Sequence, residues 1–258
     1  MMKKLAMNEI STSSVEEYLA ICSDLVRKWS SPESGEPCLW YRGQKNASWG
    51  LIPGEYRFPY LDADEIRSEF VLKAKALLDR VPATDWDWYF IMQHHGLPTR
   101  LLDWTEGSLI GLHFALSQDT GKSDSAVWIL DPWALNRWSI KKPDLVITGA
   151  EFESNSVALK YLGPVYKKLM LPQRPIAVVP PHNSARITAQ RGTFTVHGKR
   201  IEGLEIQFNT RLKKIVIPKD RCLEMRRSLR SAGISEFTLF PDLDGLCRDI
   251  RSVEIEGC

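Results

Sequence analysis

The order in which helical and strand-forming segments follow one another constrains the fold of this chain most strongly. In the first half, apolar residues recur at the spacing of amphipathic helices, and one short buried strand at 38–41 stands between the first two helices. An extended segment at 99–104 leads into the last helix of this half. The four predicted helices cover about 13–30, 62–80, 85–95 and 108–116.

Beyond residue 125 the pattern changes to short runs of β-prone residues separated by Gly, Pro and polar clusters. Two more helices, at 219–232 and 243–250, close the chain. Strands and helices do not alternate regularly, so we predict an α+β fold in which the N-terminal helices pack on a mixed or antiparallel sheet. The predicted strands are 126–130, 145–148, 176–179, 185–189, 193–197 and 214–217.

Length and composition indicate one large soluble domain. The chain has 258 residues, of which 43% are hydrophobic and 26% charged, as in ordinary globular proteins. We expect residues 1–37 to form an N-terminal helix and linker, and 38–258 to form the main domain. Five cysteines with no Cys-x-x-Cys pair predict neither a disulfide framework nor a zinc site. No apolar run approaches the ~20 residues of a membrane span, and we expect a cytoplasmic protein.

The distribution of charge differs between the two parts of the chain. Residues 1–138 carry 14 Lys and Arg against 19 Asp and Glu, whereas residues 139–258 carry 20 against 13. Basic side chains on one face of the second part would suit nucleic acid as a partner or acceptor. The alternative is that the helix at 219–232 is simply amphipathic, with a solvated basic face.

The segment 93–104 concentrates polar chemistry at the end of a predicted helix. His95, Thr99, Arg100 and Asp103 are the candidate functional residues here, because side chains at a helix end and the following turn can converge on a pocket. The alternative is structural: the histidines cap the helix, and Arg100 pairs with Asp103. Two adjacent histidines on a helix do not have the spacing of metal ligands, so no metal is expected.

A second candidate segment is Tyr41-Arg42-Gly43-Gln44. The Arg42 guanidinium offers paired N–H donors that suit a phosphate, and Gly43 would let a ligand approach the backbone. The alternative is that Arg42 closes a buried ion pair with Glu55 or Glu69.

These motifs resemble the FRG domain, a bacterial and phage-associated family named for its Phe/Tyr-Arg-Gly motif. The resemblance rests on 41–43, on Glu69-Phe70, on the run from Met92 to Thr105, and on Leu112-His113-Phe114-Ala115. It extends to 186–194 and 239–245, and so covers about residues 38–250. The family name records a motif and implies no particular activity.

A weaker resemblance to ADP-ribosyltransferases of the Arg-Ser-Glu type implies a mechanism. In those enzymes, an aromatic-Arg-Gly strand end binds the NAD phosphates, a Ser/Thr strand followed by a helix shapes the nicotinamide pocket, and a late Glu stabilises the charge developing on the ribose. Tyr41, Arg42 and Gly43 are similar to the first element, and 99–116 to the second. Gln190 stands where the late Glu is expected, and the Glu-x-Glu triplets at 151–153 and 254–256 are poorly placed.

The combined resemblance predicts an ADP-ribosyltransferase-like fold and an NAD-dependent toxin or phage-defence effector. The alternative is a non-catalytic module that recognises a phosphate-bearing ligand or nucleic acid with the same pocket. The expected residues form two sets. The catalytic set is Arg42, His95, Thr99, Arg100, Asp103 and Gln190, and the set that binds NAD is Tyr41, Arg42, Gly43, Gln44 and Trp104.

Overall fold

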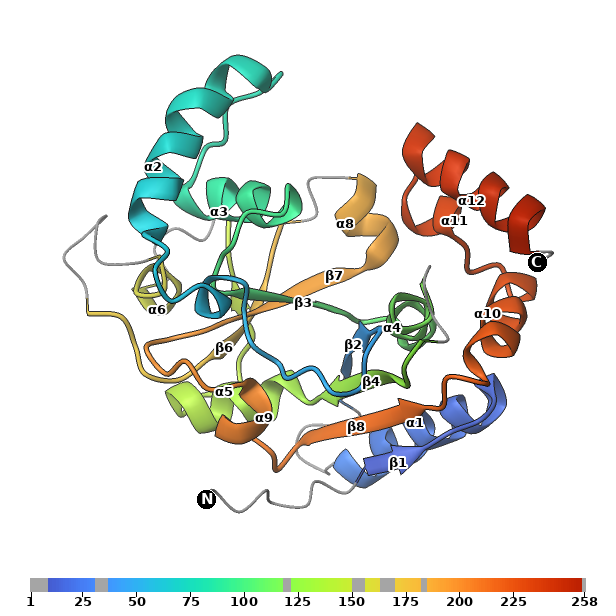
Figure 1. Ribbon diagram of the computed structural model, residues 1–258. Helices are drawn as coiled ribbons and strands as arrows, with labels where there is room; N and C mark the ends of the chain where they lie inside the picture. The colour runs from blue at the N-terminus through green and yellow to red at the C-terminus, as the bar shows by residue number, and fades with distance from the viewer. Residues whose placement is uncertain are drawn as a thin grey trace.

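A mixed sheet of eight strands forms the centre of the molecule in the computed structural model, which describes residues 9–30, 37–117, 122–149, 156–162, 170–181 and 185–256 (Figure 1). The strand order is β1-β8-β4-β2-β3-β7-β6-β5. The pairs at the two ends, β1 with β8 and β5 with β6, are parallel, and the others are antiparallel. The strands are β1 Glu9–Ser11, β2 Trp40–Gln44, β3 Leu101–Thr105, β4 Ser125–Leu130, β5 Val146–Ile147, β6 Ile176–Val179, β7 Gly192–Val196 and β8 Leu212–Ile217.

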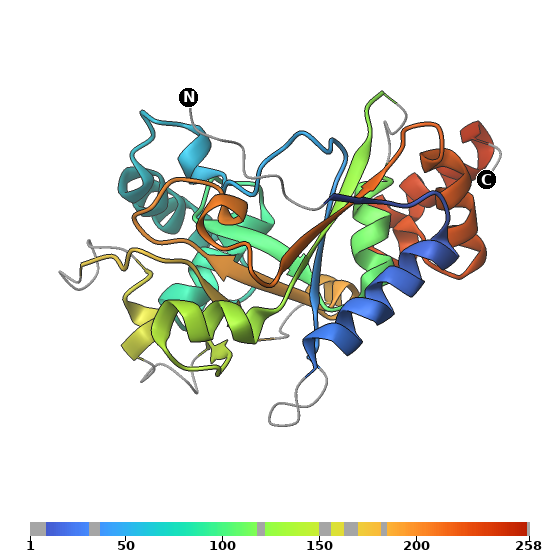
Figure 2. The same ribbon diagram turned by 90° about the horizontal axis from the view of Figure 1, so that it is seen from below.

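Helices surround this sheet and leave its central strands buried. Figure 1 and Figure 2 show α2 and α3 at one end of the molecule, α1 and α10 to α12 at the other, and α8 between them. The helices are α1 Val15–Trp29, α2 Ala63–Ala74, α3 Asp85–His94, α4 Ser108–Ala115, α5 Pro132–Ile140, α6 Ser156–Leu159, α8 Ala185–Gln190, α9 Leu204–Gln207, α10 Cys222–Ser231, α11 Glu236–Leu239 and α12 Leu243–Glu256.

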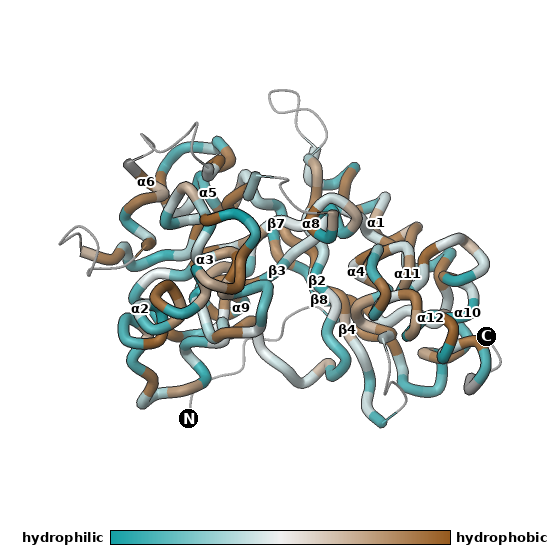
Figure 3. Tube along the Cα trace, turned by 90° about the horizontal axis from the view of Figure 1, so that it is seen from above, coloured by the Kyte–Doolittle hydropathy of each residue, from teal (hydrophilic) through white to brown (hydrophobic). Residues whose placement is uncertain are grey.

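Three apolar clusters hold the layers together. The first joins α1, α4 and α10 to β2, β4 and β8. The second joins α3 to β3, β6 and β7, and the third lies under α5 and α9. Figure 3 shows the corresponding hydrophobic segments where α4 meets β4 and where α3 lies over β3. Because α1 shares a cluster with three central strands, the N-terminal helix contributes directly to the core.

The sheet divides between its two central strands. β2 pairs with β4 over five residues and β3 pairs with β7 over five, but β2 and β3 pair only at Tyr41 and Thr105. Beyond that pair the two strands diverge. Side chains from both strands can therefore enter the space between them.

Close backbone packing explains the glycine in the middle of β2. A Cβ at Gly43 would lie 2.2 Å from the Ala115 backbone nitrogen and 2.3 Å from the Gly111 oxygen of α4. A Cβ at Gly111 would lie 2.6 Å from the Tyr41 Cβ. The side of Gly43 where a Cβ would stand therefore packs against helix α4, and the approach of a ligand to its backbone stays a prediction.

Most helix predictions are confirmed, with changes at the ends. The helices expected at 13–30, 85–95, 108–116 and 219–232 correspond to α1, α3, α4 and α10. The helix expected at 62–80 is shorter, since α2 ends at Ala74 and a 3-10 turn follows. The α+β class is likewise confirmed.

One strand prediction was wrong, and the bounds of another are shifted. Residues 185–189 form helix α8 instead of a strand, because β3 and β6 already occupy both edges of β7, and the segment instead lies beside the sheet with no buried residue. The strand expected to end before Arg42 runs on to Gln44, which places Arg42 in mid-strand.

The sequence analysis did not predict β1, α5 or the three four-residue helices α6, α9 and α11. The strand β1 has only three residues and is held by parallel pairing with β8, so it has no periodicity to detect. Helix α5 did have a signal, because Asp131 caps its first turn and Pro132 occupies its first position. Among the residues described, no helix is long and apolar enough to cross a membrane.

The contact between β2 and α4 predicts a large effect of one methyl group. We expect Gly43→Ala to lower the free energy of unfolding by about 3 kcal/mol or more, because the added Cβ meets helix backbone that cannot rotate away. Gly192→Ala, also in a strand, is the matched control, since its Cβ would meet nothing closer than 3.8 Å. Urea denaturation of both variants measures the difference, and equal losses would contradict the packing argument.

Candidate functional site

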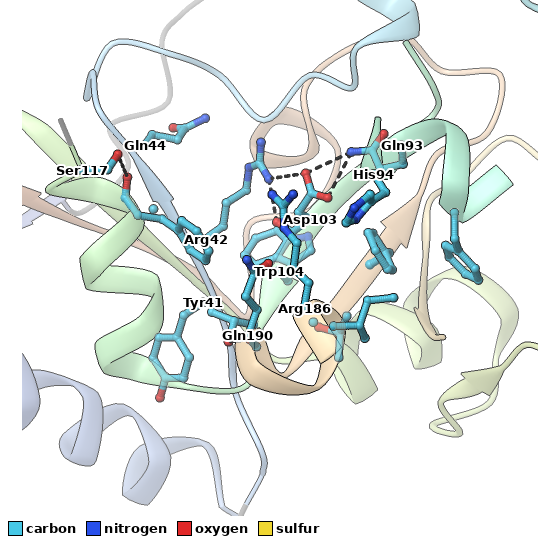
Figure 4. Close-up of a pocket in the computed structure, with 18 of the residues that line it drawn as sticks. Tyr41, Arg42, Gln44, Gln93, His94, Asp103, Trp104, Ser117, Arg186 and Gln190 are labelled. Atoms are coloured by element: carbon cyan, nitrogen blue, oxygen red, sulfur yellow. Dashed lines mark hydrogen bonds and ion pairs between the residues drawn. The ribbon is translucent and has the colours of Figure 1, made fainter. Parts of the chain in front are cut away.

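A cavity of about 540 Å³ opens where β2 and β3 diverge. Its size falls within the usual range for small-molecule sites. Both β2 and β3 contribute to its wall, together with the segment after β2, the end of α3, and α8 (Figure 4). The polar residues that line it are Arg42, Gln44, Lys45, Arg57, Gln93, His94, Asp103, Thr105, Ser117, Arg186, Gln190 and Thr193.

Arg42 and Asp103 connect the two diverging strands. The Arg42 Nη1 donates to the main-chain oxygen of Asp103 at 2.6 Å and lies 3.5 Å from its carboxylate Oδ2. The Arg42 side chain is 18% exposed and the Asp103 side chain 59%. Burial lowers the pKa of Arg42, and the Asp103 charge opposes that shift. The Arg42 Nε is buried without a protein acceptor, so one N–H of the fork remains to be satisfied.

A short chain of hydrogen bonds orients the Asp103 carboxylate. The Gln93 Nε2 donates to both carboxylate oxygens, at 3.1 and 3.0 Å. The Thr99 hydroxyl donates to the Gln93 Oε1 at 2.5 Å, which fixes the amide so that its NH₂ group faces Asp103. Asp103 is thus held from two sides, by Gln93 and Arg42.

The cavity wall is strongly cationic. Lys45, Arg57 and Arg186 line it together with Arg42, and Asp103 is the one carboxylate among the lining residues that the structure describes. Of these cations, only Arg42 forms an ion pair with a described carboxylate. Burial lowers the pKa of Arg186, a shift that Asp103 and Asp242 oppose. An excess of unpaired cations in a concave site favours an anionic ligand.

The two adjacent histidines have different positions. His94 lines the cavity, and burial together with the nearby Arg186 charge lowers its pKa, which favours the neutral imidazole near pH 7. His95, the residue selected from the sequence, is exposed at the C-cap of α3 and does not line the cavity. The sequence pattern located the helix end but could not distinguish its two side chains.

Gln190 lines the same cavity as Arg42. Its Nε2 donates to the main-chain oxygen of Leu239 at 3.1 Å, so the amide group also connects α8 to α11. The Thr105 hydroxyl donates to the Gln190 main-chain oxygen at 2.6 Å. Of the two Glu-x-Glu triplets, 151–153 lies outside the described residues, and Glu254 is exposed near the end of α12.

Arg100 and Thr99 lie outside the cavity wall. The expected pair of Arg100 with Asp103 was wrong, because Arg100 Nε faces Glu55 Oε1 at 3.5 Å while its two terminal nitrogens donate to the main-chain oxygens of His197 and Tyr161. The alternative pairing of Arg42 with Glu55 or Glu69 does not occur, because Arg42 pairs with Asp103, Glu55 pairs with Arg100 and Glu69 pairs with Lys73. Alternation along β3 explains the outcome, since residues 100 and 103 are an odd number apart and point to opposite faces.

Four further residues expected to bind NAD line the cavity and also make contacts within the framework. Tyr41 is buried, and Figure 4 shows its ring directed away from the Arg42–Asp103 pair. The Gln44 amide donates to the Gly50 oxygen and accepts from the Trp128 indole. The Trp104 indole donates to the Thr195 hydroxyl. Gly43 packs on α4, as described above.

The sequence analysis did not select several lining residues. These include Lys45, Arg57 and Arg186. Lys45 and Arg186 are about 140 residues apart in the chain, so no local sequence pattern relates them. Aromatic rings from the segment after β2, from α3, from α4 and from β7 also line the wall. They are Trp49, Phe90, Phe114 and Phe194. No group of three or more potential metal ligands occurs within the described ranges.

One known family model matches the part of the chain that contributes the centre of this site. Residues 38–124 match the model of the FRG domain, so this part of the chain is similar to that family. This match contains Arg42, Gln93 and Asp103, whereas Arg186 and Gln190 lie beyond it. Neither the curated proteins nor the solved structures gave a match.

The two arginine pairs predict different stability effects. Glu55→Gln leaves the buried Arg100 charge uncompensated, so we expect the free energy of unfolding to fall by about 3 kcal/mol. Asp103→Asn breaks a pair whose carboxylate is mostly exposed, and we expect a loss of at most about 1 kcal/mol. Urea denaturation at pH 7 tests both. A larger loss in Asp103→Asn would reverse these assignments.

The buried His197 predicts a dependence of stability on pH. Burial, reinforced by the charges of Arg100 and Arg42, lowers the pKa of His197 to about 3. In the unfolded chain the imidazole has a pKa near 6.5, so below that pH the unfolded state binds more protons than the folded state. His197 therefore lowers the free energy of unfolding as the pH falls from about 6.5 towards 3, by up to ~1.4 kcal/mol per pH unit.

The corresponding measurement is the slope of unfolding free energy between pH 6.5 and 4.5. We expect His197→Phe to reduce this slope and the exposed His95→Gln to leave it unchanged. Equal slopes in the wild type and His197→Phe would contradict a neutral buried imidazole.

Proposed function

We propose that this cavity binds NAD and that the protein is an ADP-ribosyltransferase-like enzyme. One observation carries the proposal: four cationic side chains surround a single oriented carboxylate in a cavity with aromatic walls. The cations suit a diphosphate, the rings suit the bases, and the carboxylate suits the positive charge that develops on the ribose when the glycosidic bond breaks.

The proposed phosphate contacts begin with Arg42, which lines the cavity and has Asp103 as its carboxylate partner. Arg57 lies close enough to Arg42 for its charge to lower the Arg42 pKa, so the two guanidinium groups form one region of positive potential. Two such side chains can bind phosphate oxygens at adjacent positions. An anion there would also relieve the repulsion between them.

Asp103 takes the role that the late Glu has in the resembled enzymes. In the proposed reaction, the bond between the ribose C1′ and the nicotinamide nitrogen breaks, and nicotinamide leaves with the electron pair. An acceptor nucleophile then bonds to C1′ and loses its proton to solvent. Asp103 stabilises the charge on the ribose, and the Gln93 contact holds the carboxylate in place throughout.

The acceptor and the biological role belong to the same proposal. Some basic residues of the C-terminal helices pair with carboxylates, as Arg221 does with Glu224 and Arg230 with Asp249, and the proposal leaves both nucleic acid and protein as acceptors. Labelled NAD incubated with cell lysate identifies the acceptor as protein, RNA or DNA. A toxin or phage-defence effector should also arrest growth when expressed in bacteria.

Arg42→Lys tests the phosphate contact. The variant keeps the charge but loses the fork of donors, so we expect ADP-ribose and NAD to bind more weakly by roughly 1–3 kcal/mol, with little loss of stability. Arg27→Lys on the exposed face of α1 is the matched control. Isothermal titration calorimetry measures both. Unchanged affinity together with a large loss of stability would make Arg42 purely structural.

Release of nicotinamide from NAD tests the catalytic step. Asp103→Asn keeps the size of the side chain but removes its charge, so we expect NAD to bind while turnover falls by at least 10²-fold. Retained turnover in this variant would remove Asp103 from the proposed mechanism.

A non-catalytic recognition module is the second candidate. The Gln190 amide donates to Leu239, and no second carboxylate lines the cavity among the described residues. Both features favour binding over catalysis. Binding of NAD or ADP-ribose without any nicotinamide release by the wild type would select this function.

A further inference from the structure

Trp49 differs from every other tryptophan of the chain in its exposure. The chain has nine tryptophans, and Trp49 alone is classed as exposed, with 52% of its surface accessible. It nevertheless lies on the cavity wall, beside the cationic residues Lys45 and Arg57. About half of the indole surface is therefore accessible to a ligand at this wall.

The segment that carries Trp49 is anchored on both sides of it. The Ala47 N–H donates to the Asp124 oxygen at 2.7 Å, and the Leu51 N–H donates to the Glu205 carboxylate at 2.9 Å. Within the segment, the Trp49 N–H donates to the Asn46 oxygen at 3.2 Å. These bonds restrain the backbone around the ring, so a ligand that binds the indole pays little additional ordering entropy.

The charges around Trp49 specify the kind of ligand. Arg57 Nε donates to the Ile52 oxygen at 2.9 Å, which fixes that side chain to the same segment. Aromatic faces next to fixed cations bind nucleotides by stacking on the base while the phosphates meet the cations. Stacking of this kind accepts any base, because each base presents a flat face.

We propose that Trp49 is the stacking platform for the base of the bound nucleotide. The inference rests on the proposed function in that the phosphates occupy the cationic cavity, but it does not depend on cleavage of NAD. It gives the cavity two distinct regions, a base site at Trp49 and a phosphate site at Arg42 and Arg57. Ligands that lack a base therefore bind only the second region.

The experiment compares ligands with and without a base in wild type and Trp49→Ala. Inorganic pyrophosphate, ADP and UDP are titrated by calorimetry. We expect Trp49→Ala to weaken ADP and UDP about 5- to 150-fold, which corresponds to ~1–3 kcal/mol at 1.4 kcal/mol per tenfold, and to leave pyrophosphate affinity unchanged. Trp49→Phe should recover much of the lost affinity for ADP. Tyr60→Ala, which removes a fully exposed ring outside this cavity, is the matched control.

A direct signature accompanies the affinities. Stacking on Trp49 should quench tryptophan fluorescence when ADP binds to the wild type, and this change should disappear in Trp49→Phe. Equal weakening of pyrophosphate and ADP by Trp49→Ala would overturn the inference, because the ring would then only support the segment.

The outcomes also separate this inference from the proposed function. If ADP binds more tightly than pyrophosphate and loses that advantage in Trp49→Ala, the inference holds even where NAD is not cleaved. If NAD is cleaved and Trp49→Ala leaves ADP affinity unchanged, the proposed function holds and the inference fails. Failure of the wild type to bind any of the three ligands overturns both.

Discussion

The contact between Arg42 and Asp103 joins two strands that would otherwise separate. β2 and β3 pair at a single position, and beyond it the Arg42 guanidinium donates to the Asp103 main-chain oxygen at 2.6 Å. A side chain thus replaces ladder hydrogen bonds where the sheet opens. The opening creates the cavity, and the same arginine supplies part of its positive charge. The cavity therefore results from the separation of β2 and β3 within the sheet. On their other edges, β2 pairs with β4 and β3 pairs with β7 over five residues each.

The protein uses its arginines in two different ways. Arg100 is buried with all its donor groups directed at Glu55 and main-chain oxygens, so it stabilises the framework behind β3. Arg57 and Arg186 have no carboxylate partner among the described residues and line the cavity. Charge that is compensated within the protein contributes to folding, whereas charge left without a partner at a concave surface is available to a ligand. This difference, more than the number of basic residues, distinguishes the site from the rest of the molecule.

Local sequence patterns identified part of the site, including Gln190 on α8, and missed Lys45, Arg57 and Arg186. The run from Gln93 to Asp103 was recognised because its residues lie together in the chain, and the FRG-domain match covers it. Within that run, however, His94 lines the cavity and His95 does not. Consecutive residues of a helix point in directions about 100° apart, so adjacent side chains face different surroundings. Arg186 could not be related to Asp103 at all, because α8 reaches the cavity only through the position of β7. The sequence pattern of 185–189 predicts a strand, because the β-branched residues at 187 and 188 are typical of strands.

The sequence by itself determined the α+β class, most of the helices and the identity of the Tyr41-Arg42-Gly43 motif. These features depend on periodicity, capping and residue type, which act over a few residues and can be detected without a fold. Tertiary structure alone decided which partner each charge has. Arg42 pairs with Asp103 across the divided sheet, and Arg100 pairs with Glu55 behind it. The physical reason is that pairing depends on which face of a strand a side chain occupies and which strand lies next to it, and both are set by long-range packing.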